Sequence, residues 1–295
     1  EDLMACWLQY ARWEGGSDPR PGSKEAAEPE DIWRAAAVLE RALSVAEGSG
    51  EGPPHEQASV AQFETLWVEL CYLHGQSAQA FEAASRGVKR CPHSPELWKA
   101  MALVAHGEDL DLQIPVVMNR AMQQTFPTAH DYLEVMLCCT SSARRALGKA
   151  MEMVRSSVAF EASPGKAQIR RAKSFVKRAF RVLRKLYQAA LQVMATYYPE
   201  WHDGYFALLR DLTHSESTYG AVLCGNSAFE HAYEAWNRLL KGKMNVYAAV
   251  WTTAADCLTT LCDDLRVSNL LEGVSISDDE ESDAGDEDDD DDDDD

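Results

Sequence analysis

Residues 67–127, WVELCYLHGQSAQAFEAASRGVKRCPHSPELWKAMALVAHGEDLDLQIPVVMNRAMQQTFP, contain one pattern twice and decide the fold. The first copy opens with Trp67 and the second opens with Trp98. Arg86 and Arg120 occupy corresponding places in the second halves of the two copies. A period of about 34 residues with helical spacing of apolar positions is typical of stacked helical hairpins. Because one hairpin cannot bury its apolar face alone, we expect several to stack side by side.

The same pattern recurs on both sides of this stretch with varying fidelity. In WLQYARWE, residues 7–14, the first Trp, the Tyr and the last Glu lie on one helical face, and a partner helix follows from about Asp31. The last unit is expected to have only a stub around Leu265–Leu271 as its second helix. The predicted repeat signature consists of Trp7, Tyr10, Glu14, Arg41, Trp67, Arg86, Trp98, Arg120, Pro127, Tyr132, Tyr205 and Trp251.

Three segments interrupt the period and are predicted insertions. Residues 15–30 and 48–57 are rich in Gly, Pro and charge, which predicts surface loops. Residues 140–166 lengthen the fourth unit, whose first helix continues far past its usual end and whose second runs from about Ala167 to Tyr197. The predicted buried face of that second helix consists of Ala172, Val176, Ala179, Leu183, Tyr187, Ala190 and Met194.

Residues 1–273 are therefore predicted to form one all-α domain, a right-handed α-solenoid of about six TPR-like hairpins. Alternating apolar and polar runs are absent, so no strand is predicted. Residues 274–295 are too charged to bury a core and are predicted to be a disordered acidic tail. Since the chain begins at Glu1 rather than at Met, we expect it to be a piece of a longer protein.

The unit W-x-x-Y/L-x-x-x-E, followed by a helix with R-A-L and then a proline, resembles the half-a-TPR (HAT) repeat, most closely in the first three units. The stretches 119–137 and 232–258 are similar to the HAT domains of spliceosomal di-snRNP recycling factors. HAT proteins belong almost entirely to RNA-processing machines. The resemblance therefore implies a nuclear, non-catalytic scaffold for protein–protein interactions, above all in pre-mRNA splicing. It does not imply direct RNA binding, because these 295 residues contain no RNA-recognition motif.

The resemblance also implies a homodimer. HAT domains of this kind commonly dimerise through their C-terminal repeats. An incomplete sixth unit would leave an apolar edge for a second copy to cover. The candidate edge residues are Trp236, Leu239, Trp251 and Leu258.

Packing is the expected role of the signature aromatics, because an aromatic side chain buries a large apolar area between paired helices. They could instead serve as binding platforms. Arg41, Arg86 and Arg120 are expected to bridge helices. Glu14 is the candidate carboxylate partner across the first hairpin.

A basic helix and an acidic tail dominate the charge pattern. Residues 166–185 contain nine Lys and Arg and no acid. This face is either simply solvated or a surface for an anionic partner: RNA backbone, an acidic protein segment, or the chain's own tail. The candidate residues are Arg170, Arg171, Lys173, Lys177, Arg178, Arg181, Arg184 and Lys185.

Residues 277–295 contain 15 Asp and Glu and no base, which accounts for most of the net charge of −20. The tail either keeps the chain soluble or mimics nucleic acid toward basic proteins such as histones. Ser275 and Ser277 each precede an acid by three residues, so they are candidate sites for an acid-directed kinase. A histone or basic-protein chaperone is therefore an alternative function. HAT scaffolds of mRNA 3′-end cleavage or rRNA maturation are further alternatives.

Metal, cofactor and catalytic motifs are absent from the sequence. The eight cysteines include no CxxC pair and are expected to be reduced core thiols, and the eight histidines have no zinc-ligand spacing. No Gly-rich phosphate loop or nucleophile elbow occurs, so we predict no enzyme and no cofactor. No run of 18 apolar residues occurs, so no membrane partner is expected.

Overall fold

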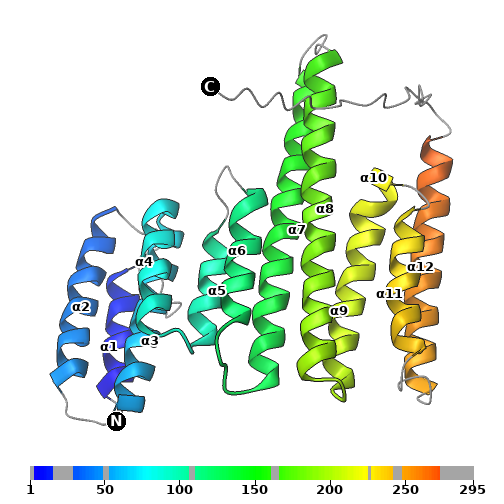
Figure 1. Ribbon diagram of the computed structural model, residues 1–295. Coiled ribbons are helices and arrows are strands. Elements are labelled where there is room, and N and C mark those ends of the chain that lie inside the picture. The colour runs from blue at the N-terminus through cyan, green and yellow to red at the C-terminus, as the bar shows by residue number, and fades with distance from the viewer. Residues whose placement is uncertain are drawn as a thin grey trace, which may run out of the picture.

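All secondary structure that the computed structural model describes is helical, and no strand occurs in those residues (Figure 1). The all-α prediction is therefore confirmed. The described residues are 3–15, 29–48, 53–105, 110–160, 166–224, 227–241 and 248–272. The helices are α1 (Leu3–Glu14), α2 (Pro29–Gly48), α3 (Pro53–Leu73), α4 (Ser77–Arg90), α5 (Pro95–Val104), α6 (Leu110–Met122), α7 (Ala129–Phe160), α8 (Lys166–Tyr197), α9 (His202–Ser215), the π-helical turn η1 (Glu216–Gly220), α10 (Ala221–Cys224), α11 (Ser227–Leu240) and α12 (Ala248–Glu272).

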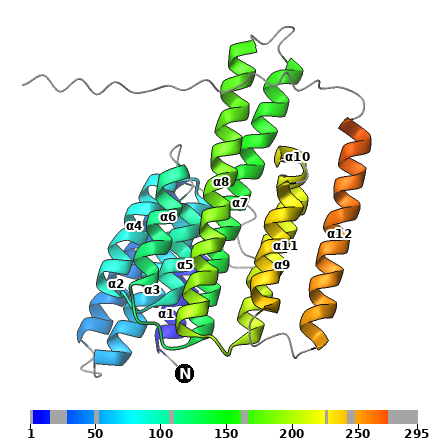
Figure 2. The same cartoon turned by 45° about the vertical axis from the view of Figure 1, so that its right-hand side comes forward.

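The helices stand side by side in a row that runs from α1 and α2 to α12 (Figures 1 and 2). Consecutive helices pack against each other, from the α1–α2 pair to the α8–α9 pair. The odd-numbered helices α1, α3, α5, α7 and α9 also contact one another in succession and so form one layer. This arrangement is typical of a helical-repeat fold.

Helices α7 and α8 are the longest pair and project beyond their neighbours in both views (Figures 1 and 2). Each contains 32 residues, which corresponds to about 48 Å. Of the residues in the predicted insertion 140–166, those up to 160 continue α7 and Lys166 begins α8, while 161–165 lie outside the described part of the chain.

The start of α3 corrects the predicted loop over residues 48–57. The helix already begins at Pro53, so the second half of that loop is helical. A proline is compatible with a first helical turn because its missing N–H would have no intrahelical partner there. Helix α2 likewise begins at a proline, Pro29, two residues before the predicted Asp31.

The predicted stub around Leu265–Leu271 is wrong as a separate helix. These residues continue α12, which runs unbroken over 25 residues. The sequence between Ala248 and Glu272 contains neither Gly nor Pro, so nothing interrupts the helix. The last hairpin of the described residues therefore consists of α11 and α12.

One local arrangement occurs in two successive units, at the starts of α5 and α7. Trp98 Nε1 donates a hydrogen bond to the Pro92 carbonyl at 2.8 Å, which fixes the turn before α5. Tyr132 stands one repeat later, and its hydroxyl donates to the Gln124 carbonyl at 2.7 Å in the turn before α7. In both units the aromatic ring is held among apolar side chains while its polar edge closes the preceding turn.

Close packing between α3, α4 and α5 depends on Gly87. A Cβ at this position would lie 2.8 Å from Leu97 Cδ2 and 3.3 Å from Glu64 Cβ. An alanine there would require the Leu97 side chain to shift and Glu64 to move by a few tenths of an ångström. The buried alanines Ala80, Ala83 and Ala84 continue the same small-residue face of α4.

Candidate functional site

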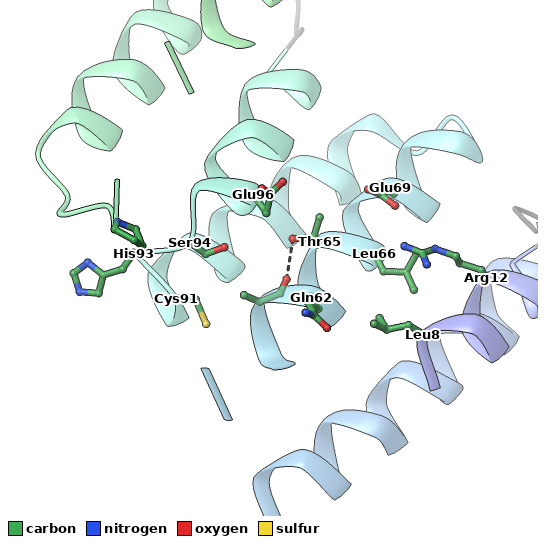
Figure 3. A pocket seen from close by; sticks show the side chains of 12 residues that line it. Leu8, Arg12, Gln62, Thr65, Leu66, Glu69, Cys91, His93, Ser94 and Glu96 are labelled. Atoms are coloured by element: carbon green, nitrogen blue, oxygen red, sulfur yellow. Dashed lines mark hydrogen bonds between the residues drawn. The ribbon is translucent and has the colours of Figure 1, made fainter. Parts of the chain in front are cut away.

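A hollow lies on the odd-helix layer, between α1, α3 and the turn before α5 (Figure 3). Its volume is about 640 Å³. Leu8 and Leu66 supply apolar walls, while Arg12, Glu69 and Glu96 place charged groups around them. Such a combination of apolar walls and few polar groups suits a protein segment.

A second hollow of about 270 Å³ adjoins the first and shares Thr65, Glu69 and Glu96 with it. It continues between α3, α5 and α7, where Tyr72 and Cys138 contribute to its lining. Together the two hollows form one groove across α1, α3, α5 and α7, which we call the odd-helix groove. No sequence pattern predicted this groove, because its lining residues come from different units.

Ion pairs fix the far end of the odd-helix groove. Lys99 Nζ donates to Glu96 Oε1 and to Glu134 Oε2, both at 2.7 Å, and so joins α5 to α7. The hydrogen bond from Lys99 outweighs partial burial and holds the pKa of Glu134 below its ordinary value. Burial opposes the charged form of Lys99, but its hydrogen bonds to the two carboxylates prevail and raise its pKa. Both groups are therefore charged at neutral pH.

Beside the first hollow, His93 connects two turns. Its Nδ1 lies 3.0 Å from the Thr125 carbonyl oxygen, which links the turn before α5 to the turn before α7. The adjacent Ser94 also lines the hollow. Because its Nδ1 is engaged by Thr125, His93 is positioned as a structural link between units.

Two buried carboxylates hold pairs of helices together. Glu64 on α3 is 2% exposed and accepts hydrogen bonds from Arg86 Nε at 3.2 Å, Arg86 Nη2 at 3.0 Å and Arg90 Nη1 at 3.1 Å, all from α4. Glu216 in η1 is 1% exposed and accepts from Arg184 Nε at 2.8 Å and Nη2 at 2.7 Å. The bridging role predicted for Arg86 is confirmed.

A groove of about 400 Å³ opens above Glu216 between α8, α9 and α11. Leu191, Tyr205 and Leu209 contribute apolar surface, and His231 lies in its wall. His231 Nδ1 is 2.9 Å from Glu216 Oε1 without forming an aligned hydrogen bond. The buried ion pair thus borders a surface depression.

Asp211 anchors a further interior network between α7, α8 and α9. It pairs with Arg144, accepts from Tyr187 Oη at 2.7 Å, and accepts from Thr140 Oγ1 at 3.1 Å. Burial, with the nearby Asp211 carboxylate, raises the pKa of Tyr187, so its hydroxyl stays protonated. These contacts give the buried hydroxyls of Thr140 and Tyr187 hydrogen-bond partners beside the apolar core.

The sequence prediction missed Glu64, Asp211 and Glu216. A signal for Glu64 exists: it lies four residues from both Val60 and Val68 on the buried stripe of α3. An acid on an apolar stripe requires a buried base nearby, since an unpaired buried charge is costly. The pairing partner, however, comes from another helix and cannot be read from the stripe itself.

The signature aromatics differ in burial. Trp98 is 4% exposed, and Trp7, Trp67, Tyr132 and Tyr205 are partly buried against the apolar clusters. The predicted packing role fits these residues. It is wrong for two others: Tyr10 is 46% exposed and stacks on Trp13, and Trp251 is 51% exposed.

Two of the three bridging arginines do not bridge helices as predicted. Arg41 and Arg120 are exposed, and neither has an ion pair among the described side chains. The predicted Glu14–Arg41 pair is also wrong: Glu14 instead forms a side-chain hydrogen bond with Tyr10, one turn earlier on the same helix. Pro127 lies exposed in the turn before α7.

The predicted dimer edge is only partly open. Trp236 is fully buried, donates from Nε1 to Thr213 Oγ1 at 3.0 Å and stacks on Phe206, so it cannot belong to an open edge. Leu258 is half-buried and Trp251 is exposed. The Leu239 side chain lies outside the described part of the chain.

The basic face of α8 is exposed at Lys177, Arg178, Arg181 and Lys185. Arg184 is the exception, because it points inward to Glu216 rather than to an anionic partner. The side chains of Arg170, Arg171 and Lys173 lie outside the described set. So do Ser275, Ser277 and the whole acidic tail.

The cysteines are free thiols, of which Cys71, Cys91 and Cys139 are buried and Cys6 is exposed. Burial raises the pKa of Cys71 to about 11, so its thiol is neutral at physiological pH. Within the described ranges, His, Cys, Asp and Glu side chains form no group that could hold a metal ion. Nor does any described helix have the length and apolar character needed to cross a membrane.

Comparisons with protein-family models, with curated proteins and with solved structures gave no match in any of the three. The resemblance to HAT repeats therefore depends on the repeat residues alone.

Proposed function

We propose that this chain is a non-catalytic HAT-repeat scaffold, a right-handed α-solenoid that holds other proteins in a nuclear RNA-processing complex. The observation that carries this proposal is the odd-helix groove, which crosses four successive units on one layer of the row. Repeat proteins use such continuous surfaces to bind extended partner segments. Lys99 and His93, which line the groove, serve as links within the fold, which is consistent with a binding rather than a catalytic role.

Pre-mRNA splicing is the process we propose, with snRNP assembly or recycling as the step. Residues 119–137 and 232–258 are similar to the C-terminal HAT domain of squamous cell carcinoma antigen recognized by T-cells 3, the spliceosomal di-snRNP recycling factor. The partners would be snRNP-associated proteins. The structure adds a physical reason for protein partners, because the groove combines apolar walls with exposed carboxylates at Glu69 and Glu96.

Capture from nuclear extract tests the proposal. The full chain is expected to enrich snRNP proteins. The double variant Gln62→Arg/Glu69→Arg places two bulky cations in the groove, so its enrichment of snRNP proteins should be at least about fivefold lower. Both residues are exposed on α3, so the fold should tolerate the change. Gln79→Arg/Glu82→Arg is the matched control, with the same residue types and charge change on the exposed face of α4. Equal losses from both variants, or no snRNP proteins at all, would contradict the proposal.

A histone or basic-protein chaperone is the second candidate, favoured by the 15 acids of residues 277–295. The same capture experiment separates the two functions when those residues are deleted. A chaperone would lose its basic partners, whereas a groove-based scaffold would keep its snRNP proteins. Captured factors of mRNA 3′-end cleavage or rRNA maturation would instead assign the scaffold to those processes.

A homodimer is part of the proposal. We expect light scattering at micromolar concentration to give twice the chain mass of 32.8 kDa. Trp251→Glu should shift the mass toward the monomer, since this exposed indole is an apolar group that α12 offers a second copy. A strict monomer for the unmodified chain would remove the dimer from the proposal.

A further inference from the structure

Three bases form a line along the outer face of α8. Lys177, Arg181 and Lys185 are spaced by four residues, so successive side chains lie about 6 Å apart along the helix axis. All three are exposed, and none has an ion pair or hydrogen bond among the described residues. Like charges at this spacing repel one another and destabilise the helix slightly. A bound anion would relieve that repulsion.

Several bases elsewhere in the described part of the chain have acidic partners, whereas Arg41 and Arg120 are exposed single bases with no ion pair there. Arg86 is paired with Glu64, and Lys99 with Glu134. On α8 itself, Arg184 turns inward to Glu216. The outer line of α8 has no such partner from the other described helices, and its own segment, residues 166–185, contains no acid.

The chemistry of this face favours an acidic peptide over RNA. Surfaces for single-stranded nucleic acid combine bases with exposed aromatic rings on which nucleobases stack. The exposed aromatic residue of α8 is Tyr197, twelve residues after Lys185 and therefore about 18 Å away along the axis. Phe175 is only partly exposed, and the Arg178 guanidinium lies 5.8 Å from its ring centroid. The face thus offers charge without a stacking platform.

We infer that the outer face of α8 is a docking surface for the chain's own acidic segment, residues 277–295. Fifteen acids without a base complement the line of unpaired cations. The C-terminal end of α12 points to the same side of the molecule as the projecting end of α8 (Figures 1 and 2). Residues 273–295 can span up to about 75 Å when extended, so the segment can reach α8.

Covalent tethering gives residues 277–295 an advantage over anionic partners that are free in solution. A segment tethered to the surface that it binds has an effective concentration in the millimolar range. A free peptide or nucleic acid of equal intrinsic affinity would compete only at similar concentrations. The contact depends on α8 and residues 277–295 alone, so it stands independently of the proposed scaffold function.

Carbodiimide crosslinking of the full chain tests the contact, because this reagent joins a lysine amine directly to a touching carboxylate. Crosslinks from Lys177 and Lys185 to peptides of residues 277–295 should be at least fivefold more frequent than those from Lys89 on α4 or Lys149 on α7, two exposed control lysines. The excess should be independent of protein concentration and should disappear in about 0.5 M salt, which shortens the screening length to a few ångström.

Charge reversal sharpens the test. Arg181→Glu leaves both reporting lysines in place and should lower their crosslinks to residues 277–295 at least threefold, while Lys89→Glu should leave them unchanged. Equal crosslinking at all four lysines would overturn the inference. A full chain that shows no excess crosslinks but binds a single-stranded RNA oligonucleotide through Arg181 would assign this face to nucleic acid and also overturn it.

Discussion

Replacing Trp98 with alanine is expected to lower the free energy of unfolding by about 3–5 kcal/mol, the range for deleting a large buried aromatic side chain. Trp98 is 4% exposed and belongs to the largest apolar cluster, which includes residues of α3 through α9. The substitution also removes the hydrogen bond from Nε1 to the Pro92 carbonyl. Urea unfolding followed by circular dichroism measures the loss.

Trp251→Ala is the matched control, because it removes the same side chain from another unit. Trp251 is 51% exposed, so its removal should cost about 1 kcal/mol, in proportion to the smaller apolar area that it buries. If the two variants lost equal stability at a protein concentration that keeps the chain monomeric, the assignment of Trp98 to the packed interior and of Trp251 to the surface would be contradicted.

This contrast shows what a repeat signature does and does not predict. The position of each tryptophan in its unit follows from the repeat period, and both lie near the start of a helix as expected. Burial depends on the units on either side. Trp98 has neighbours before and after it, whereas Trp251 lies in α12, the last described helix of the row.

Helices were predictable where the apolar spacing is regular over several turns. On α8, five of the seven residues of the predicted face are buried, because apolar side chains recur at helical spacing along this 32-residue helix. Ala179 is partly buried, and the Ala172 side chain lies outside the described set. Helix ends were less predictable. The prolines at 53 and 29 were interpreted as loop signals, although a proline also fits the first turn of a helix.

The candidate surfaces were harder to predict from the sequence than the helices. The odd-helix groove joins residues such as Leu8, Thr65 and Glu96, which belong to three different units. The basic face of α8 was visible because its residues are close in sequence. Even there, the inward turn of Arg184 depends on Glu216, which lies far along the chain in η1, and no local pattern indicates it.

Removing one partner of the buried Arg184–Glu216 pair is expected to lower the free energy of unfolding by about 3–5 kcal/mol, because the other charge is left buried without compensation. The side chains of Arg184 and Glu216 are 17% and 2% exposed. The surroundings cannot relax easily: a Cβ on Gly220 would lie 2.3 Å from Glu216 Oε2, so the carboxylate already fills the space beside η1. Glu216→Ala and Arg184→Ala should both show this loss in urea unfolding.

The double variant Arg184→Ala/Glu216→Ala should be less destabilised than the sum of the two single variants by at least about 2 kcal/mol, since neither charge then remains buried alone. The control is the pair Arg238 and Glu234 on α11, 3.8 Å apart and 76% and 67% exposed, where each alanine substitution should cost no more than about 0.5 kcal/mol. Strict additivity at the buried pair, or losses as small as those at the α11 pair, would show that Glu216 does not hold η1 against α8.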